Sequence, residues 1–171
     1  RDAMRGKTVS ESTVTMAQLM TPEDANPAGN VHGGVIMRLI DNAGGTAAAR
    51  HARCNVVTAS IDRLNFHSPV FIGDFVTMKA SLNMVGKSSM EVGVRVEAEN
   101  LITGEVRHTA SAYLTFVALD AQGHPTEVPP LILETDDERR RNHEALERRR
   151  TRMEERKKEE ACQRDRERCR Q

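Results

Sequence analysis

Two features that can take part in chemistry occur close together in the segment from Asp24 to His51: a polar loop rich in glycine and, beyond it, a carboxylate. The loop reads Asp-Ala-Asn-Pro-Ala-Gly-Asn-Val-His-Gly-Gly and leads into apolar residues at helical spacing. Gly33 and Gly34 would let a ligand approach the first free amide groups of that helix, where developing negative charge is favoured. These two backbone amides can therefore form an oxyanion site.

The carboxylate is Asp41, about two turns into the predicted helix at roughly 3.6 residues per turn. It falls among apolar residues such as Leu39 and Ile40 rather than among other charges. From the pattern alone, Asp41 is either a surface acid beside Arg38 and Asn42 or a catalytic group.

The other polar residues of the loop, Asn26, Asn30 and His32, are typical of turns and helix caps, and we prefer that interpretation for Asn30. A serine-hydrolase triad is poorly supported, because no serine stands in a nucleophile-elbow motif and His32 has no acidic partner nearby in the sequence. The remaining histidines are scattered without metal-ligand spacing, and the glycine pair lacks the Lys-Ser of a phosphate-binding loop. We expect no metal and no cofactor.

The elements that must position these residues are one helix and several strands. The helix is predicted to end near Arg53, and its second half is rich in alanine and glycine, which would allow close approach of a sheet or partner. Alternating segments rich in Val, Thr, Ile and Phe predict long strands at Val56 to Ser68, Phe75 to Val85, Met90 to Leu101 and Val106 to Leu119, with a further strand between Val9 and Met20.

The turns between the four later strands are too short for parallel crossovers, so these strands should pair antiparallel. We therefore expect an α+β domain in which a strongly curved antiparallel sheet wraps around one long helix. Such a sheet leaves open edges, and a two-fold dimer would close one of them by strand pairing.

The 171 residues suit one domain with an extension. We predict a flexible lead-in at 1–8, the domain at 9–130 and a charged tail at 131–171 that is helical or partly disordered. Opposite charges four residues apart in the tail favour a solvated helix. Because the tail has almost no apolar periodicity, we expect its removal after Pro130 to leave folding intact.

The formal net charge of zero and the lack of aromatic residues in the basic runs of the tail argue against a nucleic-acid partner. No apolar run approaches the roughly 20 residues of a membrane span, and the sequence has no secretory signal. The three cysteines, an odd number without metal spacing, fit a reducing compartment. We expect a cytoplasmic protein without membrane contact.

Four blocks of sequence add a family resemblance to this pattern. They are Gly29-Asn30-Val31-His32-Gly33-Gly34, Phe66-His67-Ser68-Pro69-Val70 with Ile72-Gly73-Asp74, Gly86-Lys87-Ser88-Ser89-Met90, and Glu127-Val128-Pro129-Pro130. In this order, and over about Val14 to Pro130, the chain resembles the hotdog-fold acyl-CoA thioesterases, in particular the cytosolic long-chain acyl-CoA hydrolases and their bacterial single-hotdog relatives.

The resemblance implies hydrolysis of medium- to long-chain fatty acyl-CoA to free acid and CoA, with CoA as part of the substrate. It also implies two catalytic side chains drawn from different subunits, Asn26 in the loop and Asp41 on the helix, and it suggests a trimer of dimers. A carboxylate near a thioester can act as a general base for water or as a nucleophile, and we take Asp41 as the base while the second role stays open.

The phosphates of CoA need donors and positive charge at the rim of the sheet. The residues predicted to supply them are Lys87, Ser88, Ser89 and Arg95. Two alternatives use the same fold without this reaction: a non-hydrolytic acyl-CoA or nucleotide-binding module, and an acyl hydratase or dehydratase.

Overall fold

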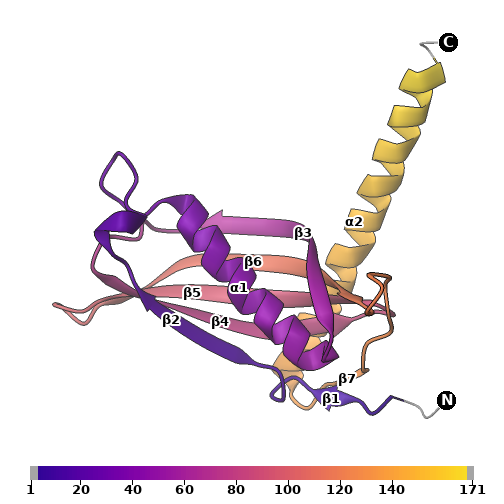
Figure 1. Ribbon diagram of the computed structural model, residues 1–171, viewed down its shortest axis with the longest axis horizontal. Coiled ribbons are helices and arrows are strands. Elements are labelled where there is room, and N and C mark those ends of the chain that lie inside the picture. Colours follow the sequence, from indigo (N-terminus) through magenta and orange to yellow (C-terminus); the bar gives the residue numbers. More distant parts are fainter. Residues whose placement is uncertain (1–3, 169–171) are drawn as a thin grey trace.

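The computed structural model describes the backbone of residues 4–168 and the side chains of residues 4–163. Its main elements are β2 (Val14–Leu19), η1 (Pro22–Asp24), α1 (Gly33–Ala52), β3 (Asn55–Phe66), β4 (Asp74–Val85), β5 (Ser89–Asn100), β6 (Val106–Leu119) and α2 (Asp136–Arg168). The strands form one antiparallel sheet in the order β2-β4-β5-β6-β3, and α1 lies across one of its faces (Figure 1). The expected α+β fold is confirmed.

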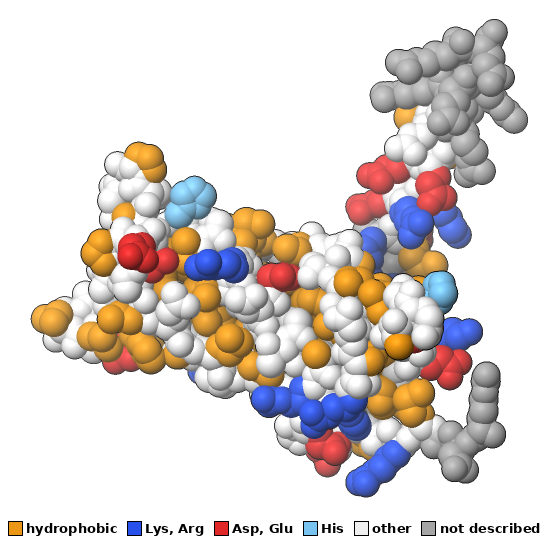
Figure 2. Space-filling model, viewed as in Figure 1, with side chains coloured by type: hydrophobic (Ala, Val, Ile, Leu, Met, Phe, Trp, Pro, Cys, Tyr) orange, Lys and Arg blue, Asp and Glu red, His pale blue; other side chains and the backbone are white. Residues whose placement is uncertain are grey.

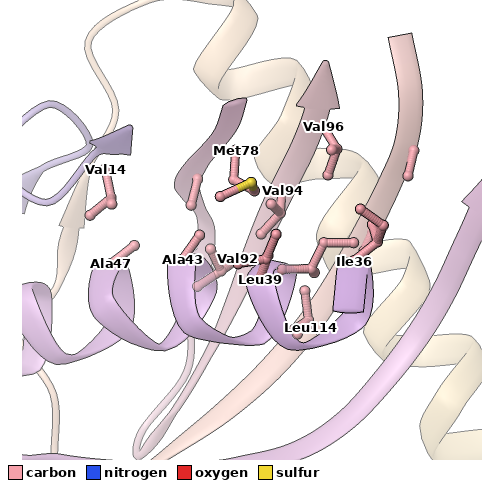
Figure 3. Packing of buried hydrophobic residues seen from close by; sticks show 14 of the residues in the cluster. Val14, Ile36, Leu39, Ala43, Ala47, Met78, Val92, Val94, Val96 and Leu114 are labelled. Atoms are coloured by element: carbon pink, nitrogen blue, oxygen red, sulfur yellow. The ribbon is translucent and has the colours of Figure 1, made fainter. Parts of the chain in front are cut away.

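The core lies between α1 and the central strands, where the apolar stripe of the helix meets side chains from β4, β5 and β6 (Figure 3). Leu39 and Ala43 on the helix and Val92, Val94 and Val96 on β5 are all almost completely buried. The alternation of these valines with polar residues correctly predicted which face of β5 is turned to the helix.

The small residues of α1 allow the close approach that was expected. A Cβ atom on Gly44 would lie 3.1 Å from the ring of Phe116, a residue of β6. Because this separation is tighter than that of ordinary Cβ contacts, a larger residue at position 44 would displace either the helix or the aromatic ring.

The C-terminal end of α1 is held by residues from both ends of the domain. Arg53 ends the helix in the left-handed conformation (φ 56°), and the Lys7 ammonium donates to the carbonyl of His51 at 2.6 Å. The buried His51 ring donates from Nε2 to the carbonyl of Pro129 at 2.8 Å. Burial lowers the pKa of His51 because it disfavours the imidazolium, and the positive charge of Lys7 acts in the same direction.

The N-terminal segment is more ordered than expected. Residues 7 and 8, assigned to a flexible lead-in, form β1 (Lys7–Thr8), which pairs in parallel with β7 (Leu131–Ile132). Residues 1–3 of the predicted lead-in lie outside the described residues. The strand predicted from Val9 begins only at Val14, because a turn closed by hydrogen bonds to the carbonyl of Val9 comes first. The chain therefore crosses the predicted boundary at 130 without a break in packing.

The charged tail forms a helix, but its first half is not simply solvated. Ala145 is fully buried, Asn142 donates to the carbonyl of Asn83 at 2.9 Å, and Arg148 forms an ion pair of 2.7 Å with Glu91. The Glu91 side chain is completely buried. The prediction of a solvated helix is therefore wrong for this half of the tail. Farther along, α2 leaves the body and carries acidic and basic side chains into solvent (Figure 2).

Within residues 4–168, no helix is both long and apolar enough to span a membrane. Across the same described part of the chain, no group of three or more His, Cys, Asp or Glu side chains is placed to hold a metal ion. Cys54 and Cys162 are free thiols, and Cys169 lies outside the described residues.

Candidate active site

Asn26 closes the loop that precedes α1. Its side-chain Oδ1 accepts hydrogen bonds from the backbone N–H groups of Ala28 at 3.0 Å and Asn30 at 3.1 Å, and its own N–H donates to the carbonyl of Asn30 at 2.7 Å. Gly29 completes the turn with φ 86°, where a side chain would be strained. Because Oδ1 is occupied, the side-chain NH2 is the group of Asn26 that can donate to a ligand.

A cavity of about 350 Å³ lies between this loop and the segment that joins β3 to β4. It brings together two of the sequence blocks, the glycine-rich loop and the Phe-His-Ser-Pro-Val segment. The residues that line it are Asn26, Asn30, Val31, Gly33, Ile36, Phe66, His67, Ser68, Pro69 and Val70. The cavity therefore places a polar loop side chain beside the first residue of a long helix, as an oxyanion site requires.

The N-terminus of α1 corrects one part of the expected oxyanion site. His32 is the N-cap, and its Nδ1 accepts a hydrogen bond of 2.9 Å from the N–H of Gly34. The structural role considered for His32 is thus confirmed. Since this cap engages the Gly34 amide, and since only Gly33 of the pair lines the cavity, we retain Gly33 as the candidate donor and remove Gly34.

Asp41 is half-buried, and it is held by a side chain that sequence analysis did not single out. The hydroxyl of Thr58 donates to Asp41 Oδ1 at 2.7 Å. Oδ2 of Asp41 takes part in no hydrogen bond or ion pair among the residues that the structure describes. The carboxylate is therefore fixed on one side and available on the other, unlike a surface acid surrounded by water.

Thr58 lies on β3, opposite Phe116 of β6, on the face of the sheet that α1 covers. A threonine in a strand rich in β-branched residues carries no functional signal of its own. Thr58 remains exposed to solvent, and the strand is irregular directly after it, because the pairing of β3 with β6 shifts between Thr58 and Ser60. Only the pairing register could have identified Thr58.

Within one protomer, the two expected catalytic residues do not lie in the same cavity. Asn26 lines the cavity at the N-terminal end of α1, whereas Asp41 is absent from its lining and contacts β3 instead. Asp41 lies seven positions after Gly34 along the helix, or roughly 10 Å at 1.5 Å per residue. One protomer thus presents two half-sites.

The four residues expected to bind CoA do not meet in one protomer. Lys87 and Ser88 lie in the turn before β5 and Ser89 is the first residue of that strand, at the opposite end of the sheet from the Asn26 loop (Figure 1). Arg95 lies about 20 Å farther along β5, at roughly 3.4 Å per residue, and donates to Glu97 at 2.8 Å. Arg95 therefore belongs to a different surface from the turn.

A helix wrapped by a curved five-stranded antiparallel sheet, with a polar loop at the helix N-terminus and a carboxylate in mid-helix, defines a hotdog domain of the thioesterase type. Residues 28–105 match the family model described as Thioesterase superfamily. The chain is 41% identical over 138 residues to the Bacillus subtilis protein named Uncharacterized acyl-CoA thioester hydrolase YkhA, covering 81% of this chain and 80% of that one. The chain belongs to the thioesterase superfamily.

Other relatives are consistent with this assignment. The rat Cytosolic acyl coenzyme A thioester hydrolase is 40% identical over 139 residues, which are 80% of this chain but 36% of that longer protein. A crystal structure of an apo-hexameric acyl-CoA thioesterase superposes with a TM-score of 0.85 at 36% identity, covering 89% of this chain and 97% of the other.

The acyl-CoA hydrolase of Staphylococcus aureus, solved with butyryl-CoA, CoA and CoA disulfide, has a TM-score of 0.83 at 34% identity, with 91% of this chain and 94% of that chain covered. Three variants of the S. aureus hydrolase have also been solved, each with alanine in place of an Asn, an Asp or a Thr. These three residues have the same spacing along that chain as Asn26, Asp41 and Thr58 have here.

Proposed function

We propose that this protein is an acyl-CoA thioesterase that hydrolyses medium- to long-chain fatty acyl-CoA to the free acid and CoA. The observation that carries the proposal is the Asp41 carboxylate, held by Thr58 on one oxygen and open on the other. The names of the relatives support the substrate class, and the name of the rat relative supports a cytoplasmic location.

The arrangement suits hydrolysis assisted by a general base. Asp41 Oδ2 would take a proton from a water molecule as the water oxygen attacks the thioester carbonyl. The Asn26 NH2 group and the Gly33 N–H would stabilise the oxyanion, and a donor of this kind is typically worth about 3 to 4 kcal/mol. When the carbon–sulfur bond breaks, the protonated Asp41 can return its proton to the CoA thiolate. Attack by Asp41 itself, through an anhydride, is the other route open to the same carboxylate.

The direct test is release of free thiol from palmitoyl-CoA, followed with a thiol reagent. We expect steady release of CoA by the purified protein, because this chain carries both Asn26 and Asp41 on one hotdog domain. A protein that binds palmitoyl-CoA without releasing thiol would instead be the non-hydrolytic binding module. Conversion of an enoyl-CoA without thiol release would indicate a hydratase.

The proposed site needs two protomers, and β3 offers the surface that would join them. This 12-residue strand forms one edge of the sheet, and Val57, Ile61 and Phe66 along it are more than one-third exposed. A long apolar edge of this kind is suited to pairing with a second copy. We propose a two-fold dimer through β3, and the apo-hexameric structural relative supports assembly of three such dimers.

A two-fold axis normal to the sheet would reverse the direction of the second protomer. The Lys87-Ser88-Ser89 turn of one subunit would then lie at the same end as the Asn26 loop of the other. We retain these three residues as the proposed contacts for the CoA phosphates. Arg95, which lies on a different surface and pairs with Glu97, is no longer part of that proposal.

Complementation tests the composite site. Asn26→Ala and Asp41→Ala should each be nearly inactive alone, whereas a mixture should recover activity after subunit exchange. In a heterodimer, one site regains both side chains and the other loses both, so random exchange should restore up to about one quarter of wild-type turnover per protomer. Thiol release before and after exchange measures it. The absence of recovery, with exchange demonstrated by differently tagged subunits, would rule out a site shared between protomers.

A further inference from the structure

The strand β3 carries Thr58, whose hydroxyl holds the proposed catalytic carboxylate of Asp41, and its pairing is irregular close to Thr58. Pairing of β3 with β6 shifts between Thr58 and Ser60 and again between Ile61 and Arg63. These shifts leave residues 59 and 62 outside the ladder. A β-bulge re-aims nearby side chains, and an edge strand has a ladder on one side only to hold it in place. The direction of Thr58 is therefore not determined by the sheet alone.

The second bulge is held by α2. The carboxylate of Asp62, the unpaired bulge residue, forms an ion pair with Arg152 through Oδ2 and accepts a hydrogen bond from the hydroxyl of Ser60 at 3.2 Å through Oδ1. The side chains are 16% (Asp62) and 26% (Arg152) exposed, although residue Asp62 taken together with its backbone is exposed. This shielding of the side chains distinguishes the pair from the open ion pairs farther along the helix.

Next to its contact with β3, α2 also contacts the central strands of the sheet. One turn before Arg152, the guanidinium of Arg148 pairs with the fully buried Glu91 of β5 and lies 3.7 Å from the centre of the Tyr113 ring on β6. Tyr113 pairs in register with Arg63, the residue directly after the bulge. Consecutive turns of α2 thus contact first the central strands β5 and β6 and then the edge strand β3.

From this arrangement we infer that Arg152 and Asp62 are positioning residues for Asp41, and that α2 belongs to the catalytic unit. The link runs from Arg152 to the bulge at Asp62, four residues along β3 to Thr58, and from its hydroxyl to Asp41 Oδ1 at 2.7 Å. Loss of the α2 contact would let the bulged segment rotate, and the carboxylate would lose its fixed direction. The inference rests on the proposed function, because it assigns these residues to the orientation of the proposed base.

The test is Arg152→Gln in the 171-residue chain, with Arg156→Gln as the matched control. Arg156 lies one turn farther along α2, and its partner Glu160 is on the same helix rather than on the sheet. We expect Arg152→Gln to lower kcat for palmitoyl-CoA roughly 10-fold with KM within twofold of wild type, since a small misplacement of a catalytic group is costly to the chemical step. Arg156→Gln should leave both constants unchanged.

Three further variants separate positioning from general loosening. Asp62→Asn should show the same loss of kcat. The double variant Arg152→Gln with Asp62→Asn should be no worse than either single variant, because each change removes the same ion pair. Arg152→Lys should recover part of the loss. Unchanged elution in gel filtration shows that the β3 edge still assembles.

A kcat for Arg152→Gln within twofold of wild type would overturn the inference, as would an equal loss in Arg156→Gln or additive losses in the double variant. Wild-type protein and Asp41→Asn belong in the same assay. If wild type releases thiol and Asp41→Asn does not, a silent Arg152→Gln refutes the positioning role alone. Wild-type protein without thiol release would refute both the proposed function and this inference.

Discussion

Asp41→Asn is expected to fold like the wild type and to lose roughly 100- to 10,000-fold in kcat, the range typical of general-base assistance. Asparagine has nearly the same shape as aspartate and can still accept the hydrogen bond from Thr58, so the packing of α1 should survive. It cannot take a proton from water. KM should change little, because the missing interaction acts in the transition state.

Thiol release from palmitoyl-CoA measures the effect, and circular dichroism with gel filtration checks fold and assembly. Asn42→Ala is the matched control, since Asn42 is the next residue on the helix and is exposed. It should retain full activity. Full turnover by a folded Asp41→Asn oligomer would reject Asp41 as the base, and with it the assignment carried over from the family.

Arg148→Met is expected to lower the free energy of unfolding by about 3–5 kcal/mol, the cost of removing one partner from a buried ion pair. Arg148 donates to both carboxylate oxygens of Glu91, whose side chain is completely buried. Without the guanidinium, the Glu91 side chain keeps, among the described residues, only the hydrogen bond of 3.2 Å from Asn83. Urea unfolding followed by circular dichroism measures the change.

Arg150→Met is the control, because Arg150 lies two residues away on the exposed side of α2 and its replacement should change stability by no more than about 0.5 kcal/mol. Adding Glu91→Gln to Arg148→Met should recover part of the lost stability, since it removes the uncompensated buried charge. A loss below about 1 kcal/mol in Arg148→Met, or no recovery in the double variant, would contradict this account of the tail.

Local patterns in the sequence determined the main elements of the fold. The 3.6-residue period marked the buried face of α1, and the two-residue period marked the inward valines of β5. Short turns required antiparallel pairing, and the small residues of α1 correctly indicated close contact with the sheet at Gly44. The isolated Asp41 and the Gly33 amide became candidates from the chain itself, whereas Asn26 became one only through the family resemblance.

The tertiary structure alone decided which distant groups meet. Thr58 reaches Asp41 only because of the register of β3 and the bulges that interrupt it, and the Gly34 amide is engaged only because His32 turns back as a cap. The charges of α2 could not indicate that the helix packs on the sheet. In the sequence, its buried partner Glu91 has the same pattern as the exposed polar residues of an alternating strand. Periodicity shows which face of an element is apolar, whereas contacts between separate elements depend on register and packing.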